Sequence, residues 1–245
     1  MKQTFLILNL GCGMKPSPKV RNIDWSMCLR IGKNPLLMPL AMLLMSAPRR
    51  ERLRSLRGLD IVVHNLARGI PAADGTVDMV YHSHLLEHLD REIAEAFLSE
   101  VHRVLKPGGI VRVVVPDLEL YVRKYLASLE ASLNDPAVGG RHDQTIAALY
   151  EQSVRREAAG TAYQRPIVRT IERLLVGDAR KRGETHQWMY DRVNLRVKLE
   201  KAKFRDVTVH AFDTSAYSGW NSVGLDRKGD GPANPDSLYI EAVKI

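Results

Sequence analysis

The chain has 245 residues, of which 45% are hydrophobic and 26% are charged, as in ordinary globular proteins. Its two cysteines, Cys12 and Cys28, are too few for a disulfide framework, and no secretory signal pattern precedes the first apolar run, so we expect a cytoplasmic protein. The formal net charge of +8 favours an acidic partner. However, the basic clusters at 48–57 and 178–182 contain no interleaved aromatic residues, so nucleic acid is not the expected partner.

Short apolar runs in the first half of the chain predict buried strands. These runs are residues 4–10, 20–24, 60–66, 77–83 and 110–117. Residues 91–105 instead carry apolar side chains at helical spacing, and the Lys-Pro-Gly-Gly sequence that follows predicts the end of that helix. Strands that alternate with helices in this way indicate an α/β fold with a mostly parallel sheet.

Residues 34–57 form a second kind of segment, which is apolar at first and then rich in arginine. The apolar part is interrupted by proline and is shorter than the roughly 20 residues that a membrane span requires. Two interpretations stay open. The segment is a helix packed against the sheet, which we favour, or it makes a peripheral contact with an anionic membrane surface.

The second half begins with a long stretch, 118–185, that is helical in pattern and poor in strands. A helix is then predicted over 193–204, and strands over 206–212 and 237–244. The sequence contains no internal repeat, so we predict one domain over residues 1–245.

Residues that could bind a ligand directly follow the predicted strands. Ligands of parallel sheets bind at the carboxyl ends of the strands. Those ends are followed by Gly11-Cys12-Gly13, Asp24, Asn65, Ser83-His84 and Asp117. Glycines let a ligand approach the backbone closely, and the carboxylate of Asp24 could accept both hydroxyls of a ribose. The structural alternatives are a tight turn for the glycines, a cap or turn for Asp24, Asn65 and Asp117, and a small buried apolar residue for Cys12.

Four motifs occur in order between residues 5 and 118: LNLGCG, NID, DGTVDMVYHSHLLEHL and EVHRVLKPGGIVRVVVPDL. With them the chain resembles class I S-adenosylmethionine-dependent methyltransferases of the type 11 group. The resemblance implies a Rossmann-like fold with a seven-stranded, mostly parallel sheet whose last strand is antiparallel. It also implies S-adenosylmethionine as cofactor and a helical cap, 118–185, over the substrate.

The same resemblance implies the cofactor-binding residues. Gly11 and Gly13 would line the methionine portion, Asp24 the ribose, Asn65 and Leu66 the adenine, while Ser83 and His84 would face the sulfonium. The full predicted set is Asn9, Gly11, Cys12, Gly13, Asp24, Asn65, Leu66, Ser83 and His84.

The glycine loop departs from the family pattern at two positions. Asn9 stands where an acid is usual, and Lys15 stands where the third glycine is usual. Pro16, Pro18 and the early arrival of Asp24 leave little room for a helix behind the loop, so we predict that this helix is shortened or lost. A dinucleotide needs that helix for its pyrophosphate, so the loop favours a cofactor without phosphate.

His84, Glu87 and His88 would share one face of a helix. A histidine here could act as general base, or the three residues could serve a structural role, which we favour. They also resemble the Glu-x-x-Glu-His metal pattern of other methyltransferases, but His84 replaces its first glutamate and Mg²⁺ prefers oxygen ligands, so we expect no metal. His84 and His186 are the candidate bases.

Aromatic residues near His186 suggest a substrate pocket, and the predicted substrate residues are Asp117, His186, Trp188 and Tyr190. The alternative is an ordinary packing cluster. HQWMYD and NPDSLYIEAVK resemble bacterial members associated with sugar and cell-surface polysaccharide pathways. We therefore expect O-methylation of a small molecule or glycan. A non-catalytic protein that docks on a partner or membrane through 35–57, and an RNA methyltransferase, are the alternative functions.

Overall fold

The structure is a computed structural model that describes residues 5–13, 15–26, 29–30, 34, 39, 50–51, 54, 60–153 and 185–245. Most of the apolar and basic segment 34–57 therefore lies outside the described residues, as does the second half of the predicted cap. Their predicted structures stay predictions. Within the described residues, no helix is long and apolar enough to cross a membrane.

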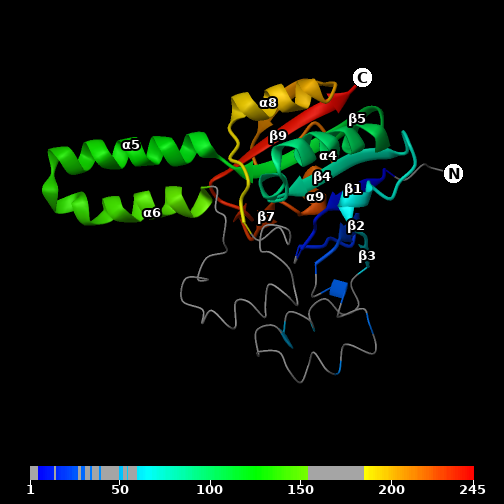
Figure 1. Cartoon of the computed structure of the whole chain (residues 1–245), viewed down its shortest axis with the longest axis horizontal. Coiled ribbons are helices and arrows are strands. Elements are labelled where there is room, and N and C mark those ends of the chain that lie inside the picture. Colours follow the sequence, from blue (N-terminus) through cyan, green and yellow to red (C-terminus); the bar gives the residue numbers. More distant parts are fainter. Residues whose placement is uncertain are drawn as a thin grey trace.

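A seven-stranded sheet forms the centre of the protein, with the order β3-β2-β1-β4-β5-β9-β6 (Figure 1). Its strands are β1 (Ile7–Leu10), β2 (Arg21–Asp24), β3 (Ile61–Val63), β4 (Val77–Ser83), β5 (Leu105–Pro116), β6 (Phe204–His210) and β9 (Ser237–Lys244). The strands β1 to β5 pair in parallel, and β9 is antiparallel to both β5 and β6. This arrangement confirms the predicted Rossmann-like fold with an antiparallel last strand.

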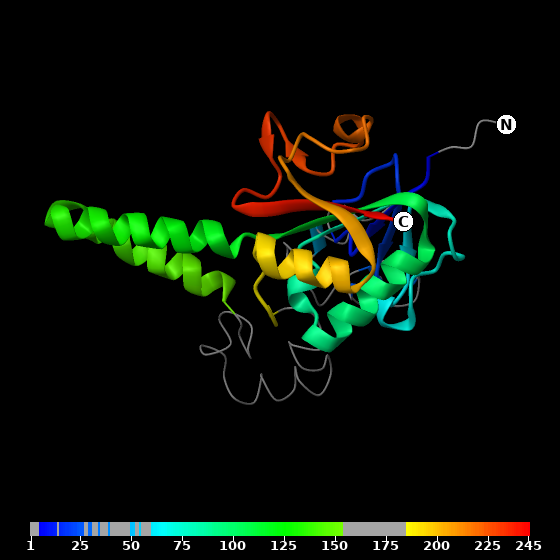
Figure 2. The ribbon, with the colours of Figure 1, turned by 90° about the horizontal axis from the view of Figure 1, so that it is seen from above.

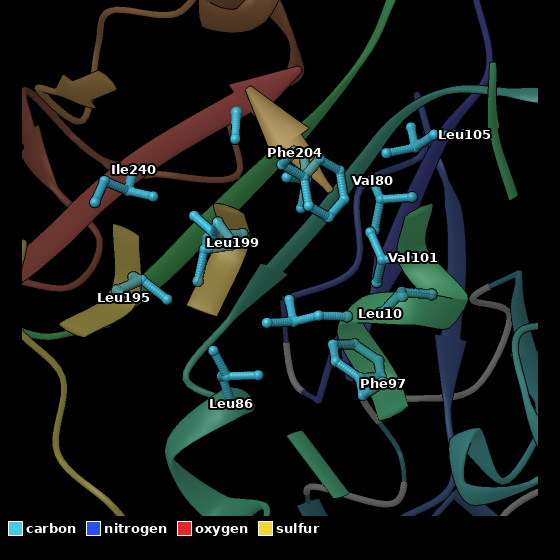
Figure 3. Close-up of a cluster of buried hydrophobic side chains, with 14 of the residues drawn as sticks. Leu10, Val80, Leu86, Phe97, Val101, Leu105, Leu195, Leu199, Phe204 and Ile240 are labelled. Atoms are coloured by element: carbon cyan, nitrogen blue, oxygen red, sulfur yellow. The ribbon is translucent and has the colours of Figure 1, made fainter. Parts of the chain in front are cut away.

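One face of the sheet is covered by α4 (Arg91–Val104) and α8 (Arg192–Lys201) (Figure 2). Their apolar sides pack on the strands in the largest hydrophobic cluster, part of which is shown in Figure 3. Phe97 and Val101 of α4 lie in that cluster together with Leu195 and Leu199 of α8. α4 ends at Val104, one residue before the Lys-Pro-Gly-Gly sequence that predicted its end, and β5 begins at Leu105.

The other face carries α9 (Trp220–Val223) and the small hairpin of β7 (Arg227–Lys228) and β8 (Gly231–Pro232) (Figure 2). Trp220 and Val223 belong to a second buried cluster with Met79 and Tyr239. Within this face the guanidinium of Arg112 is fully buried. The sequence patterns predicted none of these three small elements.

Between β1 and β2 the described residues contain no helix, which confirms that the usual first helix is lost. Side-chain amides hold the connection instead. Asn22 accepts hydrogen bonds at Oδ1 from Asn9 Nδ2 (3.0 Å) and from the Ser17 amide (3.1 Å), and it donates from Nδ2 to the Ser17 carbonyl (2.9 Å). These buried bonds replace the backbone bonds that a crossover helix would supply.

After β5 the chain forms α5 (Leu118–Asn134), η3 (Pro136–Arg141) and α6 (His142–Gln152). Both views show α5 and α6 side by side, projecting away from the sheet (Figures 1 and 2). None of the residues of either helix is buried. Because 154–184 lies outside the described residues, a cap over the substrate stays a prediction.

Candidate functional site

The glycine turn after β1 and the acid after β2 meet at the carboxyl edge of the sheet. Gly11 and Gly13 both have positive φ, +65° and +51°, which other residues rarely adopt. The Gly13 amide donates to Asp24 Oδ2 at 2.8 Å, and the Ser26 amide donates to Asp24 Oδ1 at 2.6 Å. The carboxylate is thus fixed against the glycine turn.

Replacing Gly11 by alanine should lower the free energy of unfolding by about 1–2 kcal/mol, the cost of a left-handed conformation with a Cβ atom. The new Cβ would also meet Leu85 Cδ1 at 3.1 Å. Gly75 has a similar φ, +60°, with nothing within 4 Å of its Cβ position, so Gly75→Ala is a matched control for strain alone. Urea unfolding should give Gly11→Ala a lower free energy of unfolding than Gly75→Ala. Equal free energies would show that the contact with Leu85 does not destabilise the variant.

Asn9 and Cys12 support this turn from the side of the core. Asn9 is buried and donates to the Lys15 carbonyl at 3.1 Å as well as to Asn22. Cys12 is buried in a small cluster with Leu29 and Ile61. Both residues therefore hold the backbone of the loop, which is a structural position.

At the end of β3, Asn65 caps the short helix η1 (Leu66–Arg68). Its side chain accepts a hydrogen bond from the Ala67 amide at 3.0 Å. Asn65 and Leu66 lie beyond the end of β3, which pairs with β2 up to Asp24. Asn65 therefore has the structural role in a turn that was the alternative to adenine binding. The cap uses its side-chain oxygen, so the side-chain amide nitrogen is still a donor at this edge of the sheet.

At the end of β4, Ser83 and His84 contact a segment that the sequence patterns did not single out. Asn234 donates from Nδ2 to Ser83 Oγ at 2.8 Å, and His84 Nε2 lies 3.0 Å from Ser237 Oγ. Lys15 Nζ donates to Asn234 Oδ1 at 2.5 Å, so Asn234 links the glycine loop to the end of β4. Because this contact joins residues more than 200 positions apart, no local sequence signal could have revealed it.

His84 itself has a positive φ of +50°. Histidine is one of the residue types that tolerate this conformation, although it remains uncommon. Its Nδ1 lies 3.2 Å from Glu87 Oε1, and its side chain is 34% exposed whereas that of Glu87 is 1% exposed. The ring is therefore reachable from solvent on one side and faces a buried carboxylate on the other.

Two further groups, the rings of His88 and His186, lie beside that carboxylate. Glu87 and His88 belong to η2 (Leu86–His88), and His186 comes from the segment before α8. Burial alone would raise the pKa of Glu87, but the contact with His84 and the charges of His84 and His88 hold it below its ordinary value. Burial lowers the pKa of His88; the Glu87 charge opposes this shift, and His186 adds to it.

The predicted substrate residues occupy different surroundings. Asp117 caps α5 by accepting from the Glu119 and Leu120 amides, the structural role weighed for it. Trp188 is half-buried, and the guanidinium of Arg91 lies 4.3 Å from its ring centroid. Tyr190 is fully buried in the largest hydrophobic cluster, where burial raises the pKa of its hydroxyl. Of the four residues, His186 is the one that the structure brings beside His88, with ring centroids 4.8 Å apart.

Comparison with known families adds the deciding observation. A family model described as a methyltransferase domain matches residues 41–113, a range that includes β3, β4 and α4 and the turn with Ser83 and His84. The strand order with an antiparallel β9 is that of the class I fold. Residues 41–113 therefore match a methyltransferase domain, and the sheet that contains them has the class I fold of S-adenosylmethionine-dependent methyltransferases.

Solved structures of methyltransferases resemble this one over most of their length. One from Methanosarcina mazei is 17% identical and has a TM-score of 0.46, with 100% of this chain and 94% of that chain covered. One from Thermotoga maritima is 14% identical with a TM-score of 0.44, and the match covers 98% of this chain and 82% of that chain. One from Archaeoglobus fulgidus is 16% identical with a TM-score of 0.43, and the match covers 99% of this chain and 87% of that chain. No curated protein matches the chain.

The residues of the methyltransferase fit its cofactor. S-adenosylmethionine carries no phosphate, so it needs neither the third glycine nor the helix that is missing behind the loop. Its adenosine and methionine parts require hydrogen bonds and close backbone approach, which Asp24 and the positive-φ glycines offer at adjacent strand ends.

Proposed function

We propose that this methyltransferase transfers a methyl group to an oxygen atom of a small-molecule or saccharide acceptor, with the cofactor held between Gly11, Gly13 and Asp24. The cofactor supplies a methyl group activated by a sulfonium. The observation that carries the proposal is the Asp24 carboxylate, fixed by the amides of Gly13 and Ser26 at the carboxyl edge of the sheet.

Asp24 can still accept hydrogen bonds from the two hydroxyls of a ribose. Each of its carboxylate oxygens accepts one of the amide bonds described above, and each keeps a further lone pair for a hydroxyl. The side chain is already held in place, so cofactor binding costs little additional ordering. We assign Asn9 and Cys12 to support of the loop, Asn65 and Leu66 to the adenine side, and Ser83 and His84 to the methyl-donating side.

His84 is our candidate for the general base. An oxygen nucleophile must lose its proton as the methyl arrives, and a histidine can accept it. The Glu87 carboxylate near Nδ1 favours the tautomer with its proton on that nitrogen, so that Nε2 can accept a proton. Aligning the acceptor with the methyl and excluding water are the remaining tasks of the protein.

The acceptor side is proposed from His186, Trp188, Asp117 and Tyr190. Arg91 contacts the Trp188 ring, and the solvent-accessible part of this half-buried ring is the candidate surface for a sugar. The buried position of Tyr190 assigns it to support of the neighbouring segment. Peripheral membrane contact through 34–57 remains a proposal that would bring the enzyme to lipid-linked acceptors.

Cofactor binding by an Asp24→Ala variant tests the proposal. We expect the affinity for S-adenosylmethionine to weaken by about 1–3 kcal/mol, because the ribose hydroxyls lose a charged acceptor. Isothermal titration calorimetry measures the change. Asp143→Ala, an exposed acid on the projecting α6, is the control and should bind as the unchanged protein does. Unchanged affinity in Asp24→Ala would remove this residue from the site.

The acceptor class needs a separate experiment. Methyl transfer from labelled S-adenosylmethionine should be measured on matched panels of hydroxyl and amine acceptors, including free saccharides. Turnover confined to hydroxyl acceptors supports the proposal. Turnover confined to amines would contradict O-methylation and leave the cofactor site as assigned.

A further inference from the structure

Two segments that are far apart in the sequence bring three metal-ligating side chains together. Glu87 and His88 follow β4, whereas His186 precedes α8. One ligand atom from each of the three side chains lies within 4.8 Å of the others. The set differs from the local pattern His84, Glu87 and His88, because its third member comes from the distant segment.

The backbone holds the two segments in register. The Gln187 amide donates to the Glu87 carbonyl at 2.6 Å, and the Trp188 amide donates to the same oxygen at 3.3 Å. The Gln187 side chain is buried and donates to the Thr185 carbonyl and hydroxyl. His186 therefore stands beside η2 through main-chain bonds that do not involve its own ring.

The two histidines are oriented in the same way. His88 Nδ1 lies 3.3 Å from the Thr185 carbonyl oxygen, and His186 Nδ1 lies 2.9 Å from the Gln152 carbonyl oxygen. A carbonyl oxygen only accepts, so each Nδ1 carries the proton and each Nε2 keeps its lone pair. Histidines that bind metals usually have their second nitrogen fixed in this way by a backbone carbonyl or a carboxylate.

The carboxylate of Glu87 is buried with a histidine ring nitrogen nearby and without a hydrogen bond from the described residues. Its side chain is 1% exposed, and neither oxygen accepts a hydrogen bond from the described residues. His84 Nδ1, 3.2 Å from Oε1, is an ion-pair contact of this carboxylate. A carboxylate buried without hydrogen bonds is costly, and buried charges are usually paired or coordinate a metal.

We propose that Glu87, His88 and His186 bind a divalent transition metal ion of the zinc type. Two imidazoles and one carboxylate suit Zn²⁺ better than Mg²⁺, which prefers oxygen ligands. Ligand atoms at about 2.0–2.1 Å from a tetrahedral Zn²⁺ lie roughly 3.4 Å apart, so the separations between ligand atoms would shorten by up to about 1.4 Å around the ion. Three protein ligands leave a fourth position open for water or an acceptor oxygen.

Zinc binding by the full chain, without cofactor or acceptor, tests the site independently of methyl transfer. The protein is stripped with a chelator and then titrated with Zn²⁺ in competition with a chromophoric chelator. We expect one equivalent of Zn²⁺ to bind with submicromolar affinity. Co²⁺ should give the visible absorption of a tetrahedral site with nitrogen and oxygen ligands.

Three variants remove one ligand each and keep the local hydrogen bonds. In His88→Asn and His186→Asn the amide nitrogen takes the place of Nδ1, and Glu87→Gln preserves the shape of the side chain. Each should weaken Zn²⁺ binding more than about 100-fold, since loss of an outer partner alone costs up to that factor. His142→Gln, on the projecting α6, is the control.

Circular dichroism checks that each variant folds. If the variant at buried Glu87 does not fold, the variant at half-buried His186 still tests the proposal. The proposal is overturned if the unchanged protein binds no Zn²⁺ in the competition. It is also overturned if His186→Asn binds as tightly as the unchanged protein, or if His142→Gln loses as much affinity as the three ligand variants.

Discussion

Arg112→Met is expected to lower the free energy of unfolding by about 3–5 kcal/mol, the usual result of removing one partner from a buried group of charges. The guanidinium is fully buried, donating from Nε to Asp226 Oδ2 at 2.7 Å and from Nη1 to Glu241 Oε1 at 2.8 Å. It also bonds the carbonyls of Thr214 and Ala211. Methionine fills similar space but leaves the carboxylates of Asp226 and Glu241 buried without their guanidinium partner.

Urea unfolding at neutral pH measures this loss. Arg123→Met is the matched control, since Arg123 is 72% exposed and pairs with Glu119 on the surface of α5, where the cost should stay below about 0.5 kcal/mol. Burial already raises the pKa of Asp226, and Arg112 opposes that rise. Without Arg112 a carboxyl group should take up a proton, so the loss should be smaller at pH 5. A loss near that of Arg123→Met would contradict the buried charge group.

His82 should make stability fall as the pH is lowered below neutrality. Burial lowers the pKa of its ring from 6.5 to about 4, although Glu87 opposes the shift. Below pH 6.5 the unfolded chain therefore binds a proton that the folded chain does not bind until about pH 4. The contribution of His82 is complete above pH 6.5 and should decrease by about 2 kcal/mol by pH 5, at 1.36 kcal/mol per pKa unit.

A His82→Phe variant isolates this contribution. Neither ring nitrogen of His82 has a hydrogen-bond partner among the described residues, and the ring packs edge-on against Phe97 at 5.2 Å between centroids. A phenyl ring can keep that packing and cannot titrate. Urea midpoints at pH 7.5 and pH 5.0, measured with a chelator present, should differ less in the variant than in the unchanged protein. The same difference in both proteins would mean that another group titrates.

The sheet was predictable because its strands are short apolar runs with clear boundaries. The runs before Gly11, Asp24 and Ser83 became β1, β2 and β4, and the glycine pattern without a third glycine indicated the missing helix. These signals are local: each depends on residues within one turn or strand. Local signals also indicated the caps as structural alternatives for Asp117 and Asn65, which each bond amides two or three positions later.

The contacts between distant segments were not predictable in this way. Asn234 reaches Ser83 across 151 positions, and His186 stands beside Glu87 because of backbone bonds made by its neighbour Gln187. Tyr190 is an aromatic residue of a type that often lines binding sites, but its ring is buried in the core. Burial and partner choice depend on how complete elements pack, and no spacing rule along the chain contains that information.

The position of β9 has a consequence for how the protein is made. β9, Ser237–Lys244, is the last strand in chain order, yet it lies between β5 and β6, and among the described residues β6 pairs with β9 alone. While the ribosome is still translating the residues before β9, β5 has an open edge and β6 has no neighbour in the sheet. Arg112 of β5 also lacks its ion-pair partner Glu241, which belongs to β9, until that strand has been translated. The nascent chain must therefore keep two strand edges from pairing wrongly until β9 has emerged. The interval before β9 emerges is the stage of synthesis at which a chaperone would protect this half of the sheet.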